Sequence, residues 1–158
     1  MVEASRDKAR VAHQTNSRDM SQAKSVICFD YGTATIGVAV GQFITGTASP
    51  LDDLRARDGI PNWDSIAKII EDWRPDLLLV GLPLNMDGSE SELSARARKF
   101  ANRLYGRFGL PVKMADERLS SFEAKGRILE RTGSQDFKGN RVDSLAAQLI
   151  LESWLREQ

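Results

Sequence analysis

Residues 25–32 read Ser-Val-Ile-Cys-Phe-Asp-Tyr-Gly, an uninterrupted apolar run that ends in an acid and then a glycine. A short, wholly apolar run of this kind is typical of a central β-strand that is buried on both faces. The strand therefore delivers Asp30 to one edge of a sheet. Gly32 lacks a side chain at that edge, so it is a candidate for the close approach of a phosphate group.

Working outward from this strand, the spacing of apolar residues predicts a mixed α/β domain. Further strands are expected over residues 36–40, 43–48, 76–81 and 112–116, with glycine and proline as breaks. Helices are expected over residues 62–73, 89–108, 121–131 and 142–155. Antiparallel hairpins followed by β-α-β crossovers give a mixed five-stranded sheet flanked by helices.

The helix expected over residues 89–108 has two distinct faces. Ser89 and Glu92 have the spacing of an N-terminal capping box. One face is apolar and consists of Leu93, Ala97, Phe100, Ala101, Leu104 and Phe108. Beside it lies a row that we call the basic stripe, made of Arg96, Lys99, Arg103 and Arg107. The stripe either tracks a phosphate backbone or is a solvated helix surface. Trp63 and Trp73, in the preceding helix, are expected in the core.

The charge balance restricts how this chain could bind a polyanion. Its 158 residues carry 22 Lys plus Arg and 22 Asp plus Glu, a formal net charge of zero. This excludes a histone-like polycation, so any footprint for nucleic acid must be local. The length fits one domain, expected over residues 25–158 after a flexible polar extension over residues 1–24.

The single cysteine, Cys28, cannot form an intrachain disulfide or a zinc site based on cysteines, and it is expected in the core. A reducing cytoplasm fits this usage best. The apolar runs are too short to span a bilayer, so no membrane association is expected.

Three acids stand where strand ends and a helix start can converge. Asp30 ends the first strand, Glu117 follows the strand over residues 112–116, and Asp143 lies in the first turn of the last helix. Carboxylates without histidine or cysteine partners suit Mg²⁺ or Mn²⁺ rather than Zn²⁺. Such ions can clamp the attacking and leaving oxygens of a phosphoryl displacement. Taken singly, each acid also fits a plain role in a turn, a surface ion pair or a helix terminus.

The motifs that hold these acids resemble those of the YqgF family, nucleases that process pre-16S rRNA and are also described as Holliday junction resolvases. In order, they are Asp30-Tyr31-Gly32, Ile36 to Val40, Gly81 to Gly88, Asp116 to Ser120, and Val142 to Ala147. The likeness extends from about Ser25 to the C-terminus. It implies an RNase H-like fold and a divalent-metal-dependent phosphodiester nuclease. The catalytic and metal-binding carboxylates that it implies are Asp30, Glu117 and Asp143.

Two positions depart from the family's pattern. The family usually has a basic residue just before the Ile-Gly pair, whereas this chain has Ala34 and Thr35, so a phosphate contact from that point is expected to be absent or weak. The related superfamily often has an acid where this chain has Gly81, and Glu117 is expected to take that role. The candidate substrate-binding residues are Gly32, Asn85, Arg103, Arg107, Arg118, Lys138 and Arg141.

Three functions remain open at this point. The first is processing of the 5′ end of pre-16S rRNA in ribosome biogenesis. The second is Holliday junction resolution in DNA recombination and repair, which needs two active sites and hence a homodimer. The third is a non-catalytic nucleic-acid-binding module, against which the three acids argue. Because no exposed apolar stripe indicates a dimer interface, the RNA substrate is favoured.

Overall fold

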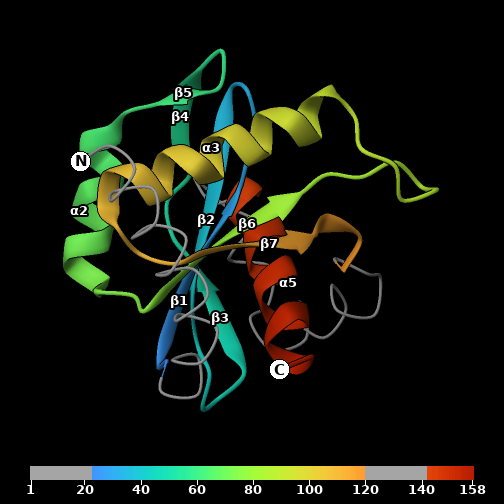
Figure 1. Cartoon of the computed structure of the whole chain (residues 1–158). Helices are drawn as coiled ribbons and strands as arrows, with labels where there is room; N and C mark the ends of the chain where they lie inside the picture. Colours follow the sequence, from blue (N-terminus) through green and yellow to red (C-terminus); the bar gives the residue numbers. More distant parts are fainter. Residues whose placement is uncertain (1–22, 120–141) are drawn as a thin grey trace, which may run out of the picture.

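The computed structural model describes residues 23–119 and 142–158 (Figure 1). The expected helix over residues 121–131, the candidates Lys138 and Arg141, and nearly all of the expected N-terminal extension lie outside the described residues. The strands are β1 (Ser25–Asp30), β2 (Thr35–Gln42), β3 (Thr47–Pro50), β4 (Leu54–Arg57), β5 (Ile60–Pro61), β6 (Leu77–Leu82) and β7 (Val112–Asp116). The helices are α2 (Trp63–Trp73), α3 (Glu92–Phe108), the 3₁₀ turn η2 (Glu117–Leu119) and α5 (Val142–Arg156).

The strands form one mixed sheet in the order β5-β4-β2-β1-β6-β7, with β3 also paired to β2. Strand β2 runs antiparallel to β1, β3 and β4, whereas β1, β6 and β7 are parallel. This confirms the expected class, antiparallel hairpins followed by parallel strands flanked by helices. The third strand lies later than expected, because residues 43–46 form a turn before Thr47.

Strands β4 and β5 were not predicted, which makes the expected count of five strands wrong. The signal for them was present in the sequence as Asp58-Gly59. Both residues have left-handed backbone angles, with φ of 49° and 79°. A two-residue turn with positive φ at both positions matches the right-handed twist of a hairpin, and Asp-Gly is one of its preferred sequences.

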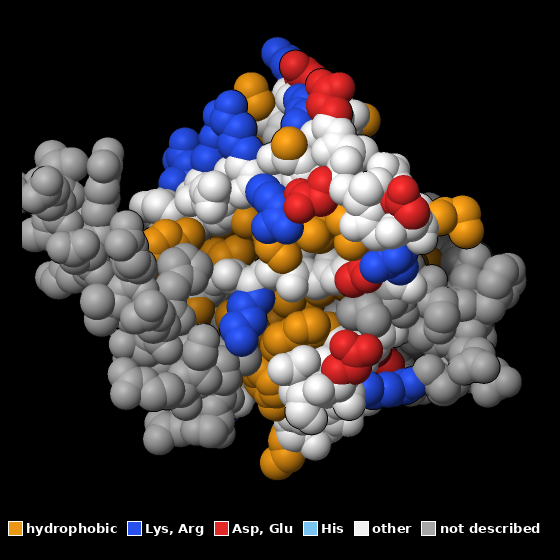
Figure 2. Space-filling view, turned by 45° about the vertical axis from the view of Figure 1, so that its right-hand side comes forward, with side chains coloured by type: hydrophobic (Ala, Val, Ile, Leu, Met, Phe, Trp, Pro, Cys, Tyr) orange, Lys and Arg blue, Asp and Glu red, His pale blue; other side chains and the backbone are white. Residues whose placement is uncertain are grey.

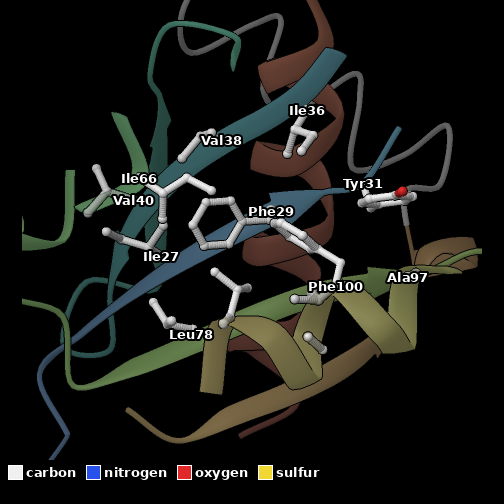
Figure 3. Close-up of a cluster of buried hydrophobic side chains, with 13 residues drawn as sticks. Ile27, Phe29, Tyr31, Ile36, Val38, Val40, Ile66, Leu78, Ala97 and Phe100 are labelled. Carbon is white, nitrogen blue, oxygen red and sulfur yellow. The ribbon is translucent and has the colours of Figure 1, made fainter. Parts of the chain in front are cut away.

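Each face of the sheet buries its own hydrophobic cluster. Helices α2 and α3 cover one face and α5 covers the other (Figure 1). In β1, Ile27 and Phe29 point toward α2 and α3 (Figure 3), whereas Val26 and Cys28 point toward α5. Side chains alternate along a strand, so Asp30 continues the row of Val26 and Cys28 onto the α5 face. The alternation thus decides on which face the first acid is displayed.

Cys28 is fully buried, which confirms that it is a core residue. Burial raises the pKa of its thiol well above the usual value, so the thiol stays protonated and is a poor nucleophile.

The two helices on the other face depart from expectation in detail. In α2, Ile66 is buried and Trp63 stacks on Phe100 at 5.8 Å between ring centroids, but Trp73 is 46% exposed, so the core prediction was wrong for Trp73. Helix α3 is capped by a box of Ser91 and Ser94 rather than Ser89 and Glu92.

The expected box fails because Ser89 is engaged elsewhere. Its backbone N–H and its hydroxyl both donate to the carboxylate of Asp87, so it belongs to the preceding turn. On the apolar face of α3, Ala97, Phe100, Ala101 and Leu104 are buried as expected, whereas Leu93 is 37% exposed at its edge.

None of the helices within the described ranges is both long and apolar enough to cross a bilayer.

Candidate active site

Asp30 and Glu117 meet on the α5 face at the ends of β1 and β7. A hydrogen bond joins their side chains. Burial, this bond, the charge of Glu117 and the charge of Asp143 together raise the pKa of Asp30 to about 8. Asp30 therefore keeps a proton at neutral pH, because two carboxyl groups in contact and away from water do not both ionise at low cost.

Gly81 leaves the space in which the side chains of Asp30 and Glu117 meet. Strand β6 lies between β1 and β7, and Gly81 pairs with Ala115, two residues before Glu117. A Cβ atom at position 81 would lie 3.1 Å from Cδ1 of Ile150 and 3.8 Å from Oδ1 of Asp30. A larger side chain, an acid included, would crowd both α5 and the carboxyl of Asp30. Strand register and Gly81 thus explain why Glu117 can reach Asp30.

Asp143 is the third acid, and residues of β2 form hydrogen bonds with it and with the next residue, Ser144. The hydroxyl of Thr35, at the start of β2, donates to Oδ2 of Asp143. The N–H of Val38 donates to the hydroxyl oxygen of Ser144 at 2.8 Å. Thr35, one of the two residues that precede the Ile-Gly pair, therefore orients a carboxylate in this chain.

Asp53, in the loop between β3 and β4, also contacts this turn of α5, and it was not among the residues predicted from the sequence. Its carboxylate accepts from the backbone N–H of Asp143 at 3.1 Å and from that of Ser144 at 2.7 Å. It also accepts from the Ser144 hydroxyl at 2.6 Å. Asp53 thus acts as an N-cap supplied from elsewhere in the chain. The one local signal was that Arg141, a poor capping residue type, precedes Val142 in the sequence.

Close contact between α5 and β2 depends on Gly37. A Cβ atom there would lie 2.1 Å from the carbonyl oxygen of Asp143 and 2.9 Å from the nitrogen of Ser144. Real Cβ contacts are essentially never below 3.0 Å, so any other residue would push the first turn of α5 away from the sheet. The position of Asp143 relative to the sheet therefore depends on a glycine.

An open hollow of about 280 Å³ adjoins the acids, lined by Asp30, the turn of residues 31–35, and Asp143. Gly32 belongs to this turn, and a Cβ there would lie 2.4 Å from the Thr35 carbonyl oxygen. The turn itself therefore requires this glycine, so the residue type is no sign of a phosphate contact. Thr33 and Ala34 are exposed at the rim, where a strand of substrate could approach.

Arg118 and Asn85 lie at the edge formed by the ends of β6 and β7. Arg118 makes an ion pair with Asp116 at 2.7 Å and a two-point hydrogen bond to the same carboxylate, which lowers the pKa of Asp116. The amide of Asn85 donates to the Ser89 hydroxyl at 2.9 Å, inside the loop that projects between β6 and α3 (Figure 1). Arg118 reaches this loop at the carbonyl oxygen of Met86, 3.5 Å away.

The basic stripe is not beside the acids, because α3 covers the opposite face of the sheet. Arg96 pairs with Asp58 at 3.0 Å, and the guanidinium carbon of Arg107 lies 4.3 Å from the centre of the Trp63 ring. Lys99 and Arg103 line a separate cavity between α3 and the turn at Gly59. Figure 2 shows Lys and Arg side chains gathered on part of one face, with Asp and Glu among them. The positive charge is therefore confined to a local patch, as expected for a chain whose net charge is zero.

The acids provide the donor chemistry of a divalent-cation site. All three are carboxylates, and Asp30 carries a proton that a cation could replace. Across residues 23–119 and 142–158, no three His, Cys, Asp or Glu side chains are already close enough together to hold a metal ion. The acids in the structure are thus in an arrangement stabilised by a proton and by the hydroxyl of Thr35.

Comparison with known proteins relates the chain to a known protein family. Residues 24–157 match the RuvX family, described as Holliday junction resolvase. A protein of Aeromonas hydrophila named "Putative pre-16S rRNA nuclease" is 57% identical over 136 residues, which cover 86% of this chain and 97% of the relative. A protein of the same name from Actinobacillus pleuropneumoniae serotype 5b is 58% identical over 136 residues, 86% of this chain and 99% of the relative.

Solved structures share the fold at low sequence identity. Thermus thermophilus RuvC in complex with a Holliday junction substrate matches with a TM-score of 0.56 and 15% identity, over 85% of this chain and 96% of that one. A fowlpox virus resolvase bound to Holliday junction DNA matches with a TM-score of 0.53 and 12% identity, over 84% of this chain and 97% of that one. These likenesses confirm the resolvase-like fold, which is the RNase H-like architecture expected from the sequence.

Proposed function

The chain belongs to the RuvX family, and from this premise we propose that it is a nuclease that hydrolyses phosphodiester bonds with the help of a divalent metal ion. The observation that carries the proposal is the contact between Asp30 and Glu117 near Asp143, which keeps Asp30 protonated at neutral pH. A carboxyl group with a raised pKa beside an open hollow, as at Asp30, is more typical of a functional site than of a surface. A merely structural role would not require the carboxyl groups of Asp30 and Glu117 to be in contact.

Asp30, Glu117 and Asp143 are the residues that would hold the metal. When bound, Mg²⁺ or Mn²⁺ supplies positive charge that activates water and stabilises the phosphate in the transition state. Ion binding replaces the proton on Asp30, so affinity should rise with pH. Asp30, Glu117 and Asp143 are also the proposed catalytic residues.

The rest of the site orients these groups. Asp53 and Gly37 hold the first turn of α5 against β2, and Thr35 turns the carboxylate of Asp143. The exposed turn at Thr33 and Ala34 leaves the hollow open to a nucleic-acid strand. Arg118 and Asn85 lie at the ends of β6 and β7, and they are the proposed substrate contacts there. Lys138 and Arg141, outside the described residues, are proposed as substrate contacts from the sequence alone.

The substrate we favour is the 5′ region of pre-16S rRNA. The support is the name of the curated relatives, which align over nearly their whole length at 57–58% identity. The compartment we favour is the cytoplasm, because a single buried free thiol, Cys28, is compatible with a reducing environment.

Resolution of Holliday junctions is the second candidate. It is favoured by the family's description and by the fold shared with two resolvases solved with junction DNA. A junction needs two symmetric cuts, so this activity requires a homodimer. Binding of nucleic acid without cleavage is the remaining alternative, and it would leave the proton-sharing acids without a role.

Cleavage assays separate these possibilities. A pre-16S leader RNA and a four-way DNA junction are each incubated with the protein in Mg²⁺ and in Mn²⁺. Asp30→Asn serves as the inactive variant, and Asp72→Asn, at an exposed acid on α2, as the matched control. Cutting of the RNA alone supports rRNA processing, and paired cuts in the junction alone support a dimeric resolvase. Binding of either substrate without cutting, identical in wild type and Asp30→Asn, would refute the nuclease proposal.

A further inference from the structure

A second hollow lies on the opposite face of the sheet from the acids. It encloses about 250 Å³ between α3 and the turn that joins β4 to β5. Lys99 and Arg103 line it from α3, and Tyr31 and Phe100 line it from the edge of the hydrophobic cluster (Figure 3). Aromatic walls with basic side chains at the mouth are a combination suited to an anionic ligand.

The turn that lines this hollow is held by hydrogen bonds from Arg96 and Tyr31. Asp58 and Gly59 form the left-handed pair of the hairpin, and the guanidinium of Arg96 donates to the carbonyl oxygen of Asp58 at 2.7 Å and to its carboxylate at 3.0 Å. The Tyr31 hydroxyl donates to the carbonyl oxygen of Gly59 at 3.3 Å. A Cβ atom on Gly59 would lie 1.8 Å from that hydroxyl oxygen. The glycine therefore keeps the turn and the tyrosine in contact.

The charge that faces the hollow is positive. Asp58 is the one acid in its lining, and Arg96 neutralises it. Within the described parts of the chain, neither Lys99 nor Arg103 is in an ion pair. Both side chains are exposed, and they lie one helical turn apart at positions i and i+4, on the same side of α3. Two cations that line the same hollow and are not neutralised by a described acid can bind a phosphate group.

The hollow is physically continuous with the turn that borders the acids. Tyr31 directly follows Asp30 and lines both hollows. The N–H of Gly59 donates to the carbonyl oxygen of Thr33, and the N–H of Ala56 donates to that of Ala34, each at 2.8 Å. The β4–β5 hairpin thus supports the turn of residues 31–35 from behind. A strand that passes over this turn would leave the acids and reach Lys99 and Arg103.

From this arrangement we infer that the hollow between α3 and the β4–β5 turn is a phosphate site that holds the substrate strand beyond the phosphate to be cleaved. The inference rests on the proposed function for its substrate and extends it to a second binding point. A phosphate carried by a free nucleotide presents the same chemistry, so the test includes one. Such a site gives Lys99 and Arg103 a role in substrate binding although they lie on the face of the sheet opposite the acids.

The test measures binding in the Asp30→Asn background, so that cleavage plays no part. Lys99→Gln/Arg103→Gln removes the two cations of the hollow. The matched control, Lys68→Gln/Arg74→Gln, removes two exposed cations of α2 and its C-terminal cap outside the hollow. A labelled single-stranded pre-16S leader RNA is titrated at several salt concentrations, and a 5′-mononucleotide is titrated separately by calorimetry. Thermal unfolding verifies that all variants are folded.

We expect the hollow variant to bind RNA about tenfold more weakly, which corresponds to one charge-assisted hydrogen bond. The slope of log affinity against log salt should fall by about 0.7 for each phosphate that the variant no longer neutralises. The control should keep both values. Equal affinity and slope in the two double variants would overturn the proposal. Loss of nucleotide binding alone, with RNA binding unchanged, would overturn the strand assignment and show that the hollow takes a free phosphate compound. Because this test measures binding alone, a wild-type protein that fails to cleave RNA in the separate cleavage assay would contradict the proposed function and not the binding site.

Discussion

The carboxylate of Asp53 caps the helix that carries Asp143: its Oδ1 accepts from both the backbone N–H and the hydroxyl of Ser144, at 2.7 and 2.6 Å. Its Oδ2 accepts from the N–H of Asp143 itself at 3.1 Å. Asp53 and Ser144 are separated by 91 positions in the chain. A loop between two strands therefore sets where one of the proposed metal ligands stands.

Replacing Asp53 should affect both stability and activity. Asp53→Ala leaves three donors of α5 without an acceptor, so we expect a loss of about 1–2 kcal/mol and a fall in Tm of about 3–6 °C. The cleavage rate of Asp53→Ala should fall by more than the loss of folded protein accounts for. The variant should also need more Mn²⁺ to reach half of its maximal rate. Thermal unfolding and metal titration of the cleavage rate are the measurements. Asp72→Ala is the control, and equal metal affinity in wild type and Asp53→Ala would contradict a positioning role.

A methyl group at position 37 should separate α5 from β2. Gly37→Ala places its Cβ 2.1 Å from the Asp143 carbonyl oxygen, so the helix must move. We expect a destabilisation of about 1–3 kcal/mol, typical of overpacking, together with loss of cleavage.

Gly106→Ala, in α3, is the matched control for that substitution. Its Cβ meets nothing within 4 Å, and the stability of the protein should rise by about 0.5–1 kcal/mol. Denaturant unfolding compares the two variants. A Gly37→Ala protein as stable and active as wild type would show that close approach of α5 to β2 is not needed.

The shared proton of Asp30 predicts a pH dependence of stability in the absence of metal. The pKa of Asp30 is raised from 3.8 to about 8, so between these values the folded protein holds a proton that the unfolded chain has released. The free energy of unfolding contributed by this group is therefore fully present below pH 4 and declines as pH rises toward 8. Asp30→Asn, which mimics the protonated acid, should be more stable than wild type by about 2 kcal/mol or more at pH 8.

The measurement is thermal unfolding in EDTA from pH 5 to pH 9. The difference in Tm between Asp30→Asn and wild type should grow with pH. Added Mn²⁺ should stabilise wild type at pH 8 and leave Asp30→Asn nearly unchanged, because the variant lacks a ligand. A difference in Tm that stays constant over this range would mean that Asp30 does not carry the proton.

Arg118 should contribute to substrate binding rather than to stability. Its pair with Asp116 is partly exposed, with side chains 46% and 33% accessible, and ion pairs that water reaches contribute little to stability. Arg118→Gln should weaken RNA binding with little change in Tm. Asp116→Asn releases the guanidinium, so it should bind RNA as well as wild type or better. Fluorescence anisotropy tests both, and tighter binding by Arg118→Gln would be the contrary result.

Much of the fold could be predicted because its signals are local and periodic. Strand β1 was evident from an apolar run ending in Asp30, and α5 from apolar residues at helical spacing. The β4–β5 hairpin was missed although Asp58-Gly59 indicated it, since Leu54 to Arg57 looks polar when only one side of the strand is half-buried. Trp73 was misplaced because periodicity gives a face of the helix but not how far the sheet extends beneath it.

The sequence by itself determined that three acids end two strands and begin a helix, and that their oxygen chemistry suits a divalent cation. Tertiary structure alone decided which groups surround them. Asp53 reaches α5 across 90 positions, Gly81 leaves space for Asp30 and Glu117 to meet, and Lys99 and Arg103 face a hollow on the opposite side. The physical reason is that periodic patterns report the local backbone, whereas a shared proton, a distant cap and a cavity arise only when remote segments pack together.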